Sequence, residues 1–260
     1  MSVHDAASAA RTLREAEASR TARGRITEEW DGLDLETAYA VQRANIEARV
    51  AAGERVIGVK LGLTSRAKQQ RMGIDSPLTA VLSDAYVLPA DQPVPRGRLI
   101  QPRAEPEIVF VMRETLRGPG VTAATALAAV DRVYGGFEII DSRYAGYDFA
   151  LPDVVADNAS SAFFTVAGVG VPPEGLDLAL EAVVLSVDGE VVDTATGAAV
   201  QGHPAEALAL AANALAARGE EIPAGSVVLT GGLTDAVPLR AGGTVTAEFT
   251  NLGSAHLTAE

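Results

Sequence analysis

The first 53 residues carry apolar positions at helical spacing. Residues 6–18 are rich in Ala, Glu and Arg, which favour helices. Asp34 stands where an N-cap is expected and Gly53 is a typical helix end, so a second helix is predicted over residues 35–52. Its apolar side chains share one face: Leu35, Ala38, Tyr39, Ile46 and Val50. We therefore predict an N-terminal helical segment over residues 1–53.

At Arg55 the pattern changes to short apolar runs bounded by turn residues. Helices are predicted at 122–131 and at 203–219, where Pro204 lies in the first turn. Because strands outnumber helices and do not alternate regularly with them, residues 54–260 favour an α+β fold over a doubly wound parallel sheet. The predicted strands are residues 55–63, 107–114, 133–140, 161–168, a hairpin over 180–195 that turns at Asp188-Gly189, and 226–230, 244–250 and 254–258.

Composition excludes several function classes. The chain has 260 residues and a net charge of -13, so it lacks the basic character that nucleic acids and anionic membrane surfaces require. It has no cysteine, which excludes disulfides and thiolate chemistry. No apolar run approaches the roughly 20 residues of a membrane helix. The start of the chain also lacks the apolar centre of a signal peptide, so we expect a cytoplasmic protein.

Two carboxylates stand at the start of the apolar run QPRAEPEIVFVM. Because side chains alternate along a strand, Glu105 and Glu107 project from one face, about 6.5 to 7 Å apart at the backbone. Arg103 could neutralise this pair in an ordinary salt bridge. Glu138, in the apolar stretch GGFEII, adds a third carboxylate, for which Arg143 is the ordinary partner. Alternatively, three carboxylates from two buried strands would form an all-oxygen site suited to Mg²⁺ or Mn²⁺.

A single lysine interrupts the apolar run VIGVKLGL. Lys60 shares its strand face with Gly58 and Gly62, and its other neighbours are apolar. It is either an exposed lysine on an edge strand or a lysine that faces a ligand. The second interpretation is favoured if Thr64 or Ser65 caps a helix through the following RAKQQRMG, because a helix N-terminus attracts carboxylates.

Two other stretches carry weaker signals. LPDVVADNASS, ahead of the apolar SAFF, has the composition of a polar turn. The TGG of VVLTGGLTD lacks the lysine and the spacing of a phosphate-binding loop, so it does not predict nucleotide binding.

Five segments occur together in a specific order: GVKLGLTSRAKQQRMG, QPRAEPEIVFV, FEIIDSRYAGYDF, LPDVVADNASS and VVLTGGLTDAVPL. In sequence and order they resemble the hydratase/decarboxylase branch of the fumarylacetoacetate hydrolase superfamily. The resemblance runs from about residue 30 to the C-terminus. It implies an N-terminal helical part and a mixed β-roll or sandwich around Mg²⁺ or Mn²⁺, with Glu105, Glu107 and Glu138 as metal ligands and Lys60 as the active-site lysine.

Within this branch the chain is most similar to members that decarboxylate 2-oxo-3-hexenedioate (4-oxalocrotonate) during meta-cleavage degradation of aromatic compounds. Leu78 stands where the hydratases of the branch carry an acid, and it would form an apolar wall for the departing carboxylate. Ser160 would contact a substrate oxygen. The resemblance also implies a homo-oligomer and a complex with the pathway's hydratase.

Two other functions remain open. One is 2-keto-4-pentenoate hydratase activity, for which Asp75 or Asp84 would be the first acid to consider. The other is a non-catalytic protein that binds a small dicarboxylate or acts as a partner of the hydratase. The presence of all three glutamates and of Lys60 favours an enzyme.

Overall fold

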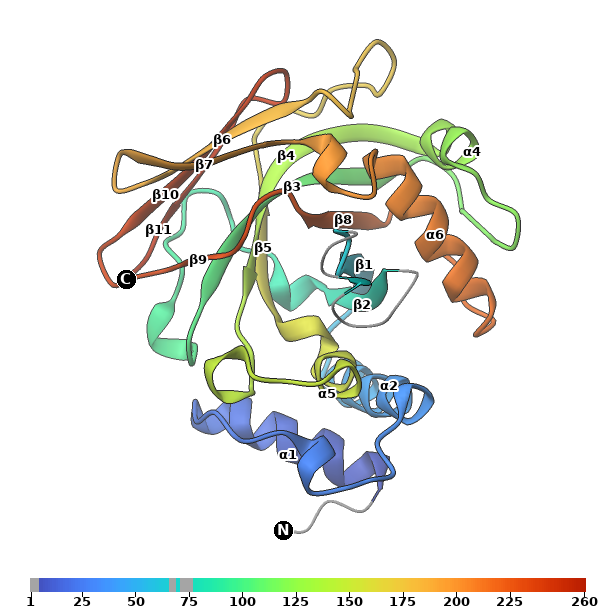
Figure 1. The fold of residues 1–260 in the computed structure, drawn as a ribbon, viewed down its shortest axis with the longest axis vertical. Helices are drawn as coiled ribbons and strands as arrows, with labels where there is room; N and C mark the ends of the chain where they lie inside the picture. The colour runs from blue at the N-terminus through green and yellow to red at the C-terminus, as the bar shows by residue number, and fades with distance from the viewer. Residues whose placement is uncertain (1–4, 66–68, 71–76) are drawn as a thin grey trace.

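The structure is a computed structural model that describes residues 5–65, 69–70 and 77–260 (Figure 1). Its N-terminal part contains helices α1 (Ala6–Ser19) and α2 (Leu35–Ala51). Asp34 caps α2 as predicted, because its carboxylate accepts a 2.8 Å hydrogen bond from the Thr37 N–H. Both predicted helices are confirmed to within one residue. Among the described residues, no helix combines the length and the apolar character needed to span a bilayer.

A mixed sheet of seven strands forms the centre of the molecule, in the order β2-β1-β8-β3-β4-β5, with β9 paired to the start of β3. Strands β1 and β8 run parallel and the other neighbours run antiparallel. The bounds are β1 (Val56–Gly62), β2 (Leu78–Ser83), β3 (Arg103–Met112), β4 (Val130–Ile140), β5 (Ser161–Val166), β8 (Val227–Gly232) and β9 (Val237–Pro238).

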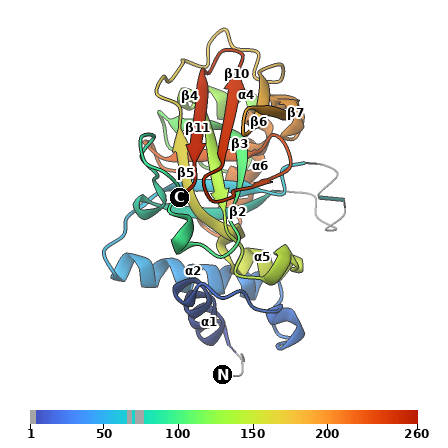
Figure 2. The same ribbon diagram turned by 90° about the vertical axis from the view of Figure 1, so that its left-hand side faces the viewer.

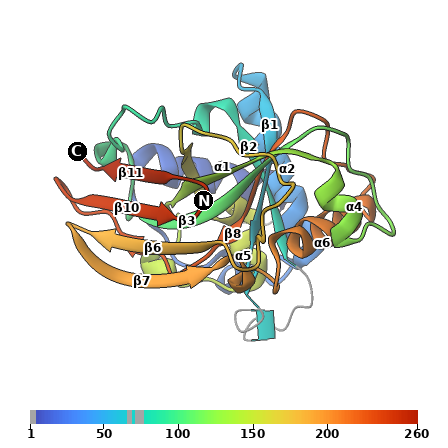
Figure 3. The ribbon, with the colours of Figure 1, turned by 90° about the horizontal axis from the view of Figure 1, so that it is seen from above.

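A second, antiparallel sheet has the strand order β11-β10-β6-β7, which Figure 3 shows side by side. Its strands are β6 (Ala182–Val187), β7 (Glu190–Thr196), β10 (Thr244–Phe249) and β11 (Ser254–Thr258). The predicted hairpin is confirmed: Asp188 and Gly189 connect β6 and β7 with φ values of 51° and 83°. Two sheets with antiparallel pairing in most places confirm the α+β prediction.

Within the described residues, further helices are α4 (Ala123–Ala128), α5 (Leu151–Ala156) and α6 (Pro204–Ala216). The helix predicted over 122–131 is shorter than expected, because Val130 already belongs to β4 and pairs with Met112. Strand β2 was not predicted. Single-turn 3₁₀ segments lie at Ile26–Glu28, Asp84–Tyr86, Arg96–Arg98, Ala145–Tyr147, Asn158–Ser160 and Gly197–Ala199.

The prediction of a polar turn at LPDVVADNASS was wrong for its first half, which forms α5. Asp153 makes this possible, since its buried carboxylate accepts hydrogen bonds from the Ala150 N–H at 3.0 Å and from Thr27. The carboxylate therefore satisfies backbone groups that the start of a helix leaves unpaired.

The two largest apolar clusters among the described residues hold these layers together. The larger lies between the two sheets and α6, and includes Phe110, Phe137 and Leu208. The smaller joins α1, α2, β2 and α5, which lie together at the N-terminal end in Figures 1 and 2. Gln42 of α2 adds a polar link, donating 3.1 Å hydrogen bonds to the carbonyls of Thr79 in β2 and Val155 in α5. The N-terminal helices thus support the β2–α5 side of the large sheet.

Candidate active site

Strand register brings the three predicted glutamates together. Glu105 and Glu138 are direct partners across β3 and β4, and Glu107 lies two residues further along β3 on the same face. One carboxylate oxygen from each glutamate lies within 4.8 Å of the others. Like charges opposite each other on neighbouring strands destabilise a sheet. The arrangement therefore requires positive charge close by.

Burial makes this requirement stronger. Glu107 is 0% exposed and Glu138 is 2% exposed. Burial raises the pKa of Glu107 well above its usual value, and the charges of Glu138 and Glu105 raise it further. Burial also raises the pKa of Glu138, although the ammonium of Lys60 opposes that shift. A cation at these oxygens would restore the ionised forms of both carboxyls.

Lys60 supplies one positive charge. It is only 3% exposed and lies on β1 between β2 and β8, so the alternative of an exposed edge lysine is wrong. Its ammonium forms an ion pair with Glu138 and donates a 2.7 Å hydrogen bond to the Ala159 carbonyl. This ammonium pairs with Glu138, and no ion pair is formed by Glu107 within the described residues.

The arginines considered as ordinary partners of the glutamates make contacts with other residues. Arg143 pairs with Asp157, and both are buried, so Arg143 is not the partner of Glu138. The guanidinium of Arg103 lies over the ring of Tyr147, 4.2 Å from the ring centroid, which is within the range of a cation–π contact.

The backbone of Gly231 lies close enough to Glu107 to form a hydrogen bond with its carboxylate. The N–H of Gly231 donates a 2.7 Å hydrogen bond to Glu107 Oε2, whereas among the described residues Glu107 Oε1 has no hydrogen-bond partner. A Cβ at Gly231 would lie 2.0 Å from Thr64 Oγ1, and one at Gly232 would lie 2.9 Å from Glu105 Cδ. The TGG motif therefore packs against the carboxylates, and the buried Glu107 Oε1 is an oxygen suited to bind a cation.

A cavity of about 210 Å³ opens beside these groups. Lys60, Glu105 and Glu138 line one part of it. Apolar side chains line another part: Leu63, Leu78, Ile140, Phe149 and Val154. Ser160 and Ala159 also line the cavity, so Leu78 and Ser160, named from the sequence, meet the charged residues there. The cavity therefore has a charged part, which can bind the polar groups of a ligand, and an apolar part that offers no hydrogen bonds.

Sequence reasoning missed several parts of this site. Tyr147, Phe149 and Val154 belong to segments whose path the sequence did not predict. The acceptor for Lys60 is a backbone carbonyl, which no side-chain motif reveals. Of the alternative acids, Asp75 lies outside the described residues. Asp84 instead accepts 2.9 Å hydrogen bonds from the backbone N–H and the side chain of Arg55, so it does not line this cavity.

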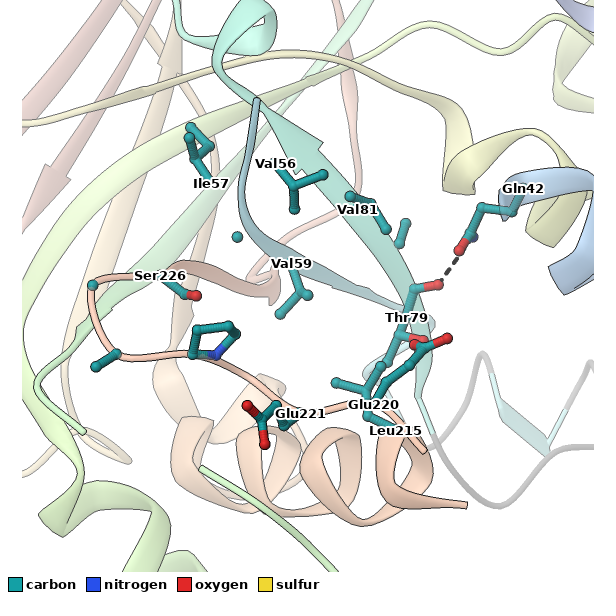
Figure 4. Close-up of a pocket in the computed structure, with 15 residues that line it drawn as sticks. Gln42, Val56, Ile57, Val59, Thr79, Val81, Leu215, Glu220, Glu221 and Ser226 are labelled. Carbon is teal, nitrogen blue, oxygen red and sulfur yellow. Dashed lines mark hydrogen bonds between the residues drawn. The ribbon is translucent and has the colours of Figure 1, made fainter. Parts of the chain in front are cut away.

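A larger cavity, of about 480 Å³, lies elsewhere (Figure 4). Ile57 and Val59 of β1 line it, together with Val81 and Leu215. Its carboxylates, Glu220 and Glu221, form ion pairs with arginines. Since the carboxylate cluster that could hold a metal ion lies at the smaller cavity, we regard the smaller one as the candidate active site.

Residues 55–258 match the family model described as fumarylacetoacetate (FAA) hydrolase C-terminal. The chain belongs to the fumarylacetoacetate hydrolase family. It is 43% identical over 230 residues to 4-oxalocrotonate decarboxylase of Pseudomonas sp. (strain CF600), covering 88% of this chain and 87% of that protein. It is 38% identical over 252 residues to 2-keto-4-pentenoate hydratase of Burkholderia vietnamiensis, covering 97% and 96% of the two chains.

A solved structure is also similar throughout. It is 4-oxalocrotonate decarboxylase from Pseudomonas putida G7 complexed with magnesium and adipate, with a TM-score of 0.95 and 38% identity. The match covers 98% of this chain and 97% of that one. The resemblance to the fumarylacetoacetate hydrolase superfamily inferred from motifs is confirmed, and so is its fold of N-terminal helices followed by mixed sheets.

The donor set of this family member fits a hard divalent cation. Three carboxylates offer oxygen ligands, which Mg²⁺ and Mn²⁺ prefer. The unpaired Glu107 Oε1 provides an oxygen with no competing partner among the described residues. Glu105, Glu107 and Glu138 are therefore the residues that would hold the ion.

Glu107→Gln should raise the melting temperature of metal-free protein and abolish its response to Mg²⁺. The amide removes one buried charge yet still accepts the Gly231 hydrogen bond, and each kcal/mol gained corresponds to about 2–4 °C for a chain of this size. Because the folded-state pKa of Glu107 is raised, metal-free wild type should lose stability as pH rises above the ordinary carboxyl value, and the variant should lose less. Thermal melts in EDTA and in Mg²⁺, across pH, measure both effects.

The matched control is Glu206→Gln, which makes the same change on the exposed surface of α6. It should leave the melting temperature and the Mg²⁺ response close to wild type. Stoichiometric Mg²⁺ binding by Glu107→Gln in calorimetry, with wild-type affinity, would contradict the metal assignment.

Proposed function

We propose that this chain decarboxylates 4-oxalocrotonate (2-oxo-3-hexenedioate) to 2-hydroxypenta-2,4-dienoate, the enol of 2-oxopent-4-enoate, and CO₂, with Mg²⁺ or Mn²⁺ as cofactor. The observation that carries the proposal is the cavity, where a buried carboxylate cluster with Lys60 meets an apolar wall. The 43% identity to a 4-oxalocrotonate decarboxylase supports the same reaction. Adipate, the ligand in the solved relative, is a dicarboxylate with the same number of carbons as this substrate.

The reaction needs two different environments. The bond between C5 and the distal carboxylate breaks, CO₂ leaves, and the electron pair moves through the conjugated carbons to the 2-oxo oxygen. A proton then completes the product. When bound, the metal ion would act as a Lewis acid toward the 1-carboxylate and the 2-oxo group.

Lys60 acts at the charged end of the substrate. Its ammonium is held by Glu138 and by the Ala159 carbonyl, so it is fixed before the substrate arrives. An ammonium has three donors, and these two contacts among the described residues leave a third for a substrate oxygen. A fixed positive charge in a buried site stabilises the negative charge that develops on that oxygen. Ser160, at the same cavity, would orient the substrate through a further oxygen contact.

The apolar wall acts at the other end. Leu78, Phe149 and Val154 offer a leaving carboxylate no hydrogen bonds, so the neutral CO₂ is favoured over the charged group. Hydration would instead need a positioned acid to deliver a proton. Leu78 stands where the resemblance expects that acid, and the wall around it is apolar. This contrast favours decarboxylation over hydration.

We also propose that the chain self-associates in the cytoplasm and forms a complex with the hydratase that consumes its product. Edge strand β7 supports an association surface, because Val191 is 64% exposed and Val192 is 49% exposed. Light scattering of the purified protein, alone and with the hydratase, measures both associations. A monomer that does not bind the hydratase would contradict this part of the proposal.

The purified protein with Mg²⁺ should release CO₂ from 4-oxalocrotonate and hydrate 2-hydroxypenta-2,4-dienoate slowly at most. The reason is the apolar wall, which favours loss of charge and supplies no acid. NMR of the products distinguishes the two reactions. Rapid conversion of the dienoate to 4-hydroxy-2-oxopentanoate, with the dicarboxylate untouched, would mean that the protein is a hydratase.

Lys60→Met should lower kcat by at least about 100-fold, since it removes a fixed charge from the developing oxyanion. Lys60→Arg should retain part of the activity, because it keeps the charge. Steady-state kinetics measure both variants. We expect no covalent adduct when wild type and substrate are treated with borohydride, so a trapped adduct at Lys60 would replace this electrostatic role with a Schiff base.

A further inference from the structure

A strained turn forms the back of the active-site cavity. Asn158, Ala159 and Ser160 follow α5 with φ values of 49°, 49° and 60°. Residues with side chains rarely adopt this left-handed region, and three in succession are disfavoured by their own local preferences. Such a conformation persists only where the surrounding structure holds it. The turn presents the Ala159 carbonyl to Lys60 and places Ser160 at the cavity.

The side chain of Asn158 links this turn to strand β2. Its Oδ1 accepts a 2.9 Å hydrogen bond from the Val81 N–H, and its Nδ2 donates a 2.9 Å hydrogen bond to the Val81 carbonyl. The carboxamide therefore pairs with β2 as a neighbouring strand would. Because β2 is at the end of the sheet order, Asn158 also satisfies backbone groups that an edge strand leaves unpaired.

Other contacts fix the two ends of the turn. Before it, the carboxylate of Asp157 pairs with Arg143, whose side chain also bonds the Asp157 carbonyl. After it, Ser161 Oγ donates a 2.7 Å hydrogen bond to the Asn158 carbonyl. Between these ends, the two hydrogen bonds of the Asn158 side chain connect the turn to β2, the strand next to the Lys60 strand β1.

We propose that Asn158 is a positioning residue for Lys60. Its two hydrogen bonds to Val81 hold the left-handed turn, and the turn holds the Ala159 carbonyl against the Lys60 ammonium. The carbonyl and Glu138 together fix the orientation of the ammonium, so that its third N–H donor points to the cavity. Without the carbonyl, Glu138 alone would orient it. The kinetic part of this inference rests on the proposed decarboxylation, whereas its structural part does not.

The amide group is essential to this role. A carboxylate at position 158 has the same shape and can accept from the Val81 N–H, but it cannot donate to the Val81 carbonyl. Asn158→Asp thus removes one bond with minimal change in volume. Gly tolerates positive φ, so Asn158→Gly removes both bonds while easing the strain, and it adds no charge.

The chain contains a matched control. Asn213 on α6 makes the same pair of bonds to one residue: Val121 N–H donates to its Oδ1 at 3.0 Å, and its Nδ2 donates to the Val121 carbonyl at 2.9 Å. Asn213 and Val121 do not line the active-site cavity. Asn213→Asp therefore reproduces the chemical change and its cost in stability away from Lys60.

A spectroscopic measurement can follow Lys60 in the resting protein. The sequence contains two lysines, Lys60 and Lys68, so protein labelled with ¹³C,¹⁵N-lysine gives two side-chain signals, and the signal lost in Lys60→Arg belongs to Lys60. At a fixed pH, the Lys60 signal should shift in Asn158→Asp and in Asn158→Gly, and should stay in place in Asn213→Asp. Steady-state kinetics with 4-oxalocrotonate should show kcat lowered about 10- to 100-fold in both Asn158 variants, as misplacement of a catalytic group predicts, and within twofold of wild type in Asn213→Asp.

Each outcome decides the inference. An unmoved Lys60 signal with wild-type kcat in a folded Asn158→Gly would overturn it, and so would an equal loss of kcat in Asn213→Asp, which would indicate general destabilisation. If Asn158→Asp does not fold, Asn158→Gly carries the test. If wild type does not turn over 4-oxalocrotonate, the proposed function fails, and the Lys60 signals alone decide whether Asn158 positions the lysine.

Discussion

The ion pair between Lys60 and Glu138 is the interaction on which the site depends. Both groups are almost fully buried, and a second and a third carboxylate lie within a few ångströms. A buried charge without a partner costs several kcal/mol, so this cluster is tolerated only when positive charge is close. The lysine supplies part of that charge and a divalent ion would supply the rest. The strands therefore hold carboxylates that repel one another, and this local cost in stability creates a site that can bind a cation.

The second constraint is the turn at Asn158–Ser160, and much of the N-terminal half supports it. Helix α5, which leads into the turn, is held by the buried Asp153, whose carboxylate binds Thr27 near the start of the chain. Gln42 of α2 connects the Val155 carbonyl of α5 with β2. The helical N-terminal segment is thus a support for the wall of the cavity rather than an appendage to the sheets.

The sequence predicted the parts of the site that depend on residue type and period. Two-residue alternation placed Glu105 and Glu107 on one face, and the apolar surroundings of Glu138 favoured a buried carboxylate. For Lys60 the sequence left an exposed edge lysine and a lysine facing a ligand both open, and only the structure shows that it is buried. It could not predict what depends on long-range register, such as the direct pairing of Glu105 with Glu138. Helix α5 was missed because its stability comes from Asp153 and Thr27, which are 126 residues apart. The role of the TGG motif was also missed, since only the packed structure shows that a Cβ at Gly232 would meet Glu105.

The order of strands in the large sheet has a consequence for the charge balance of the site. Strand β8, near the C-terminus, lies between β1 and β3, so the strand that carries Lys60 and the strand that carries Glu105 and Glu107 are joined through a segment much later in the chain. The three carboxylates lie on one hairpin of β3 and β4, whereas the Lys60 strand is linked to that hairpin through β8. The charge balance of the site is therefore a property of the completed sheet and not of the β3–β4 hairpin alone.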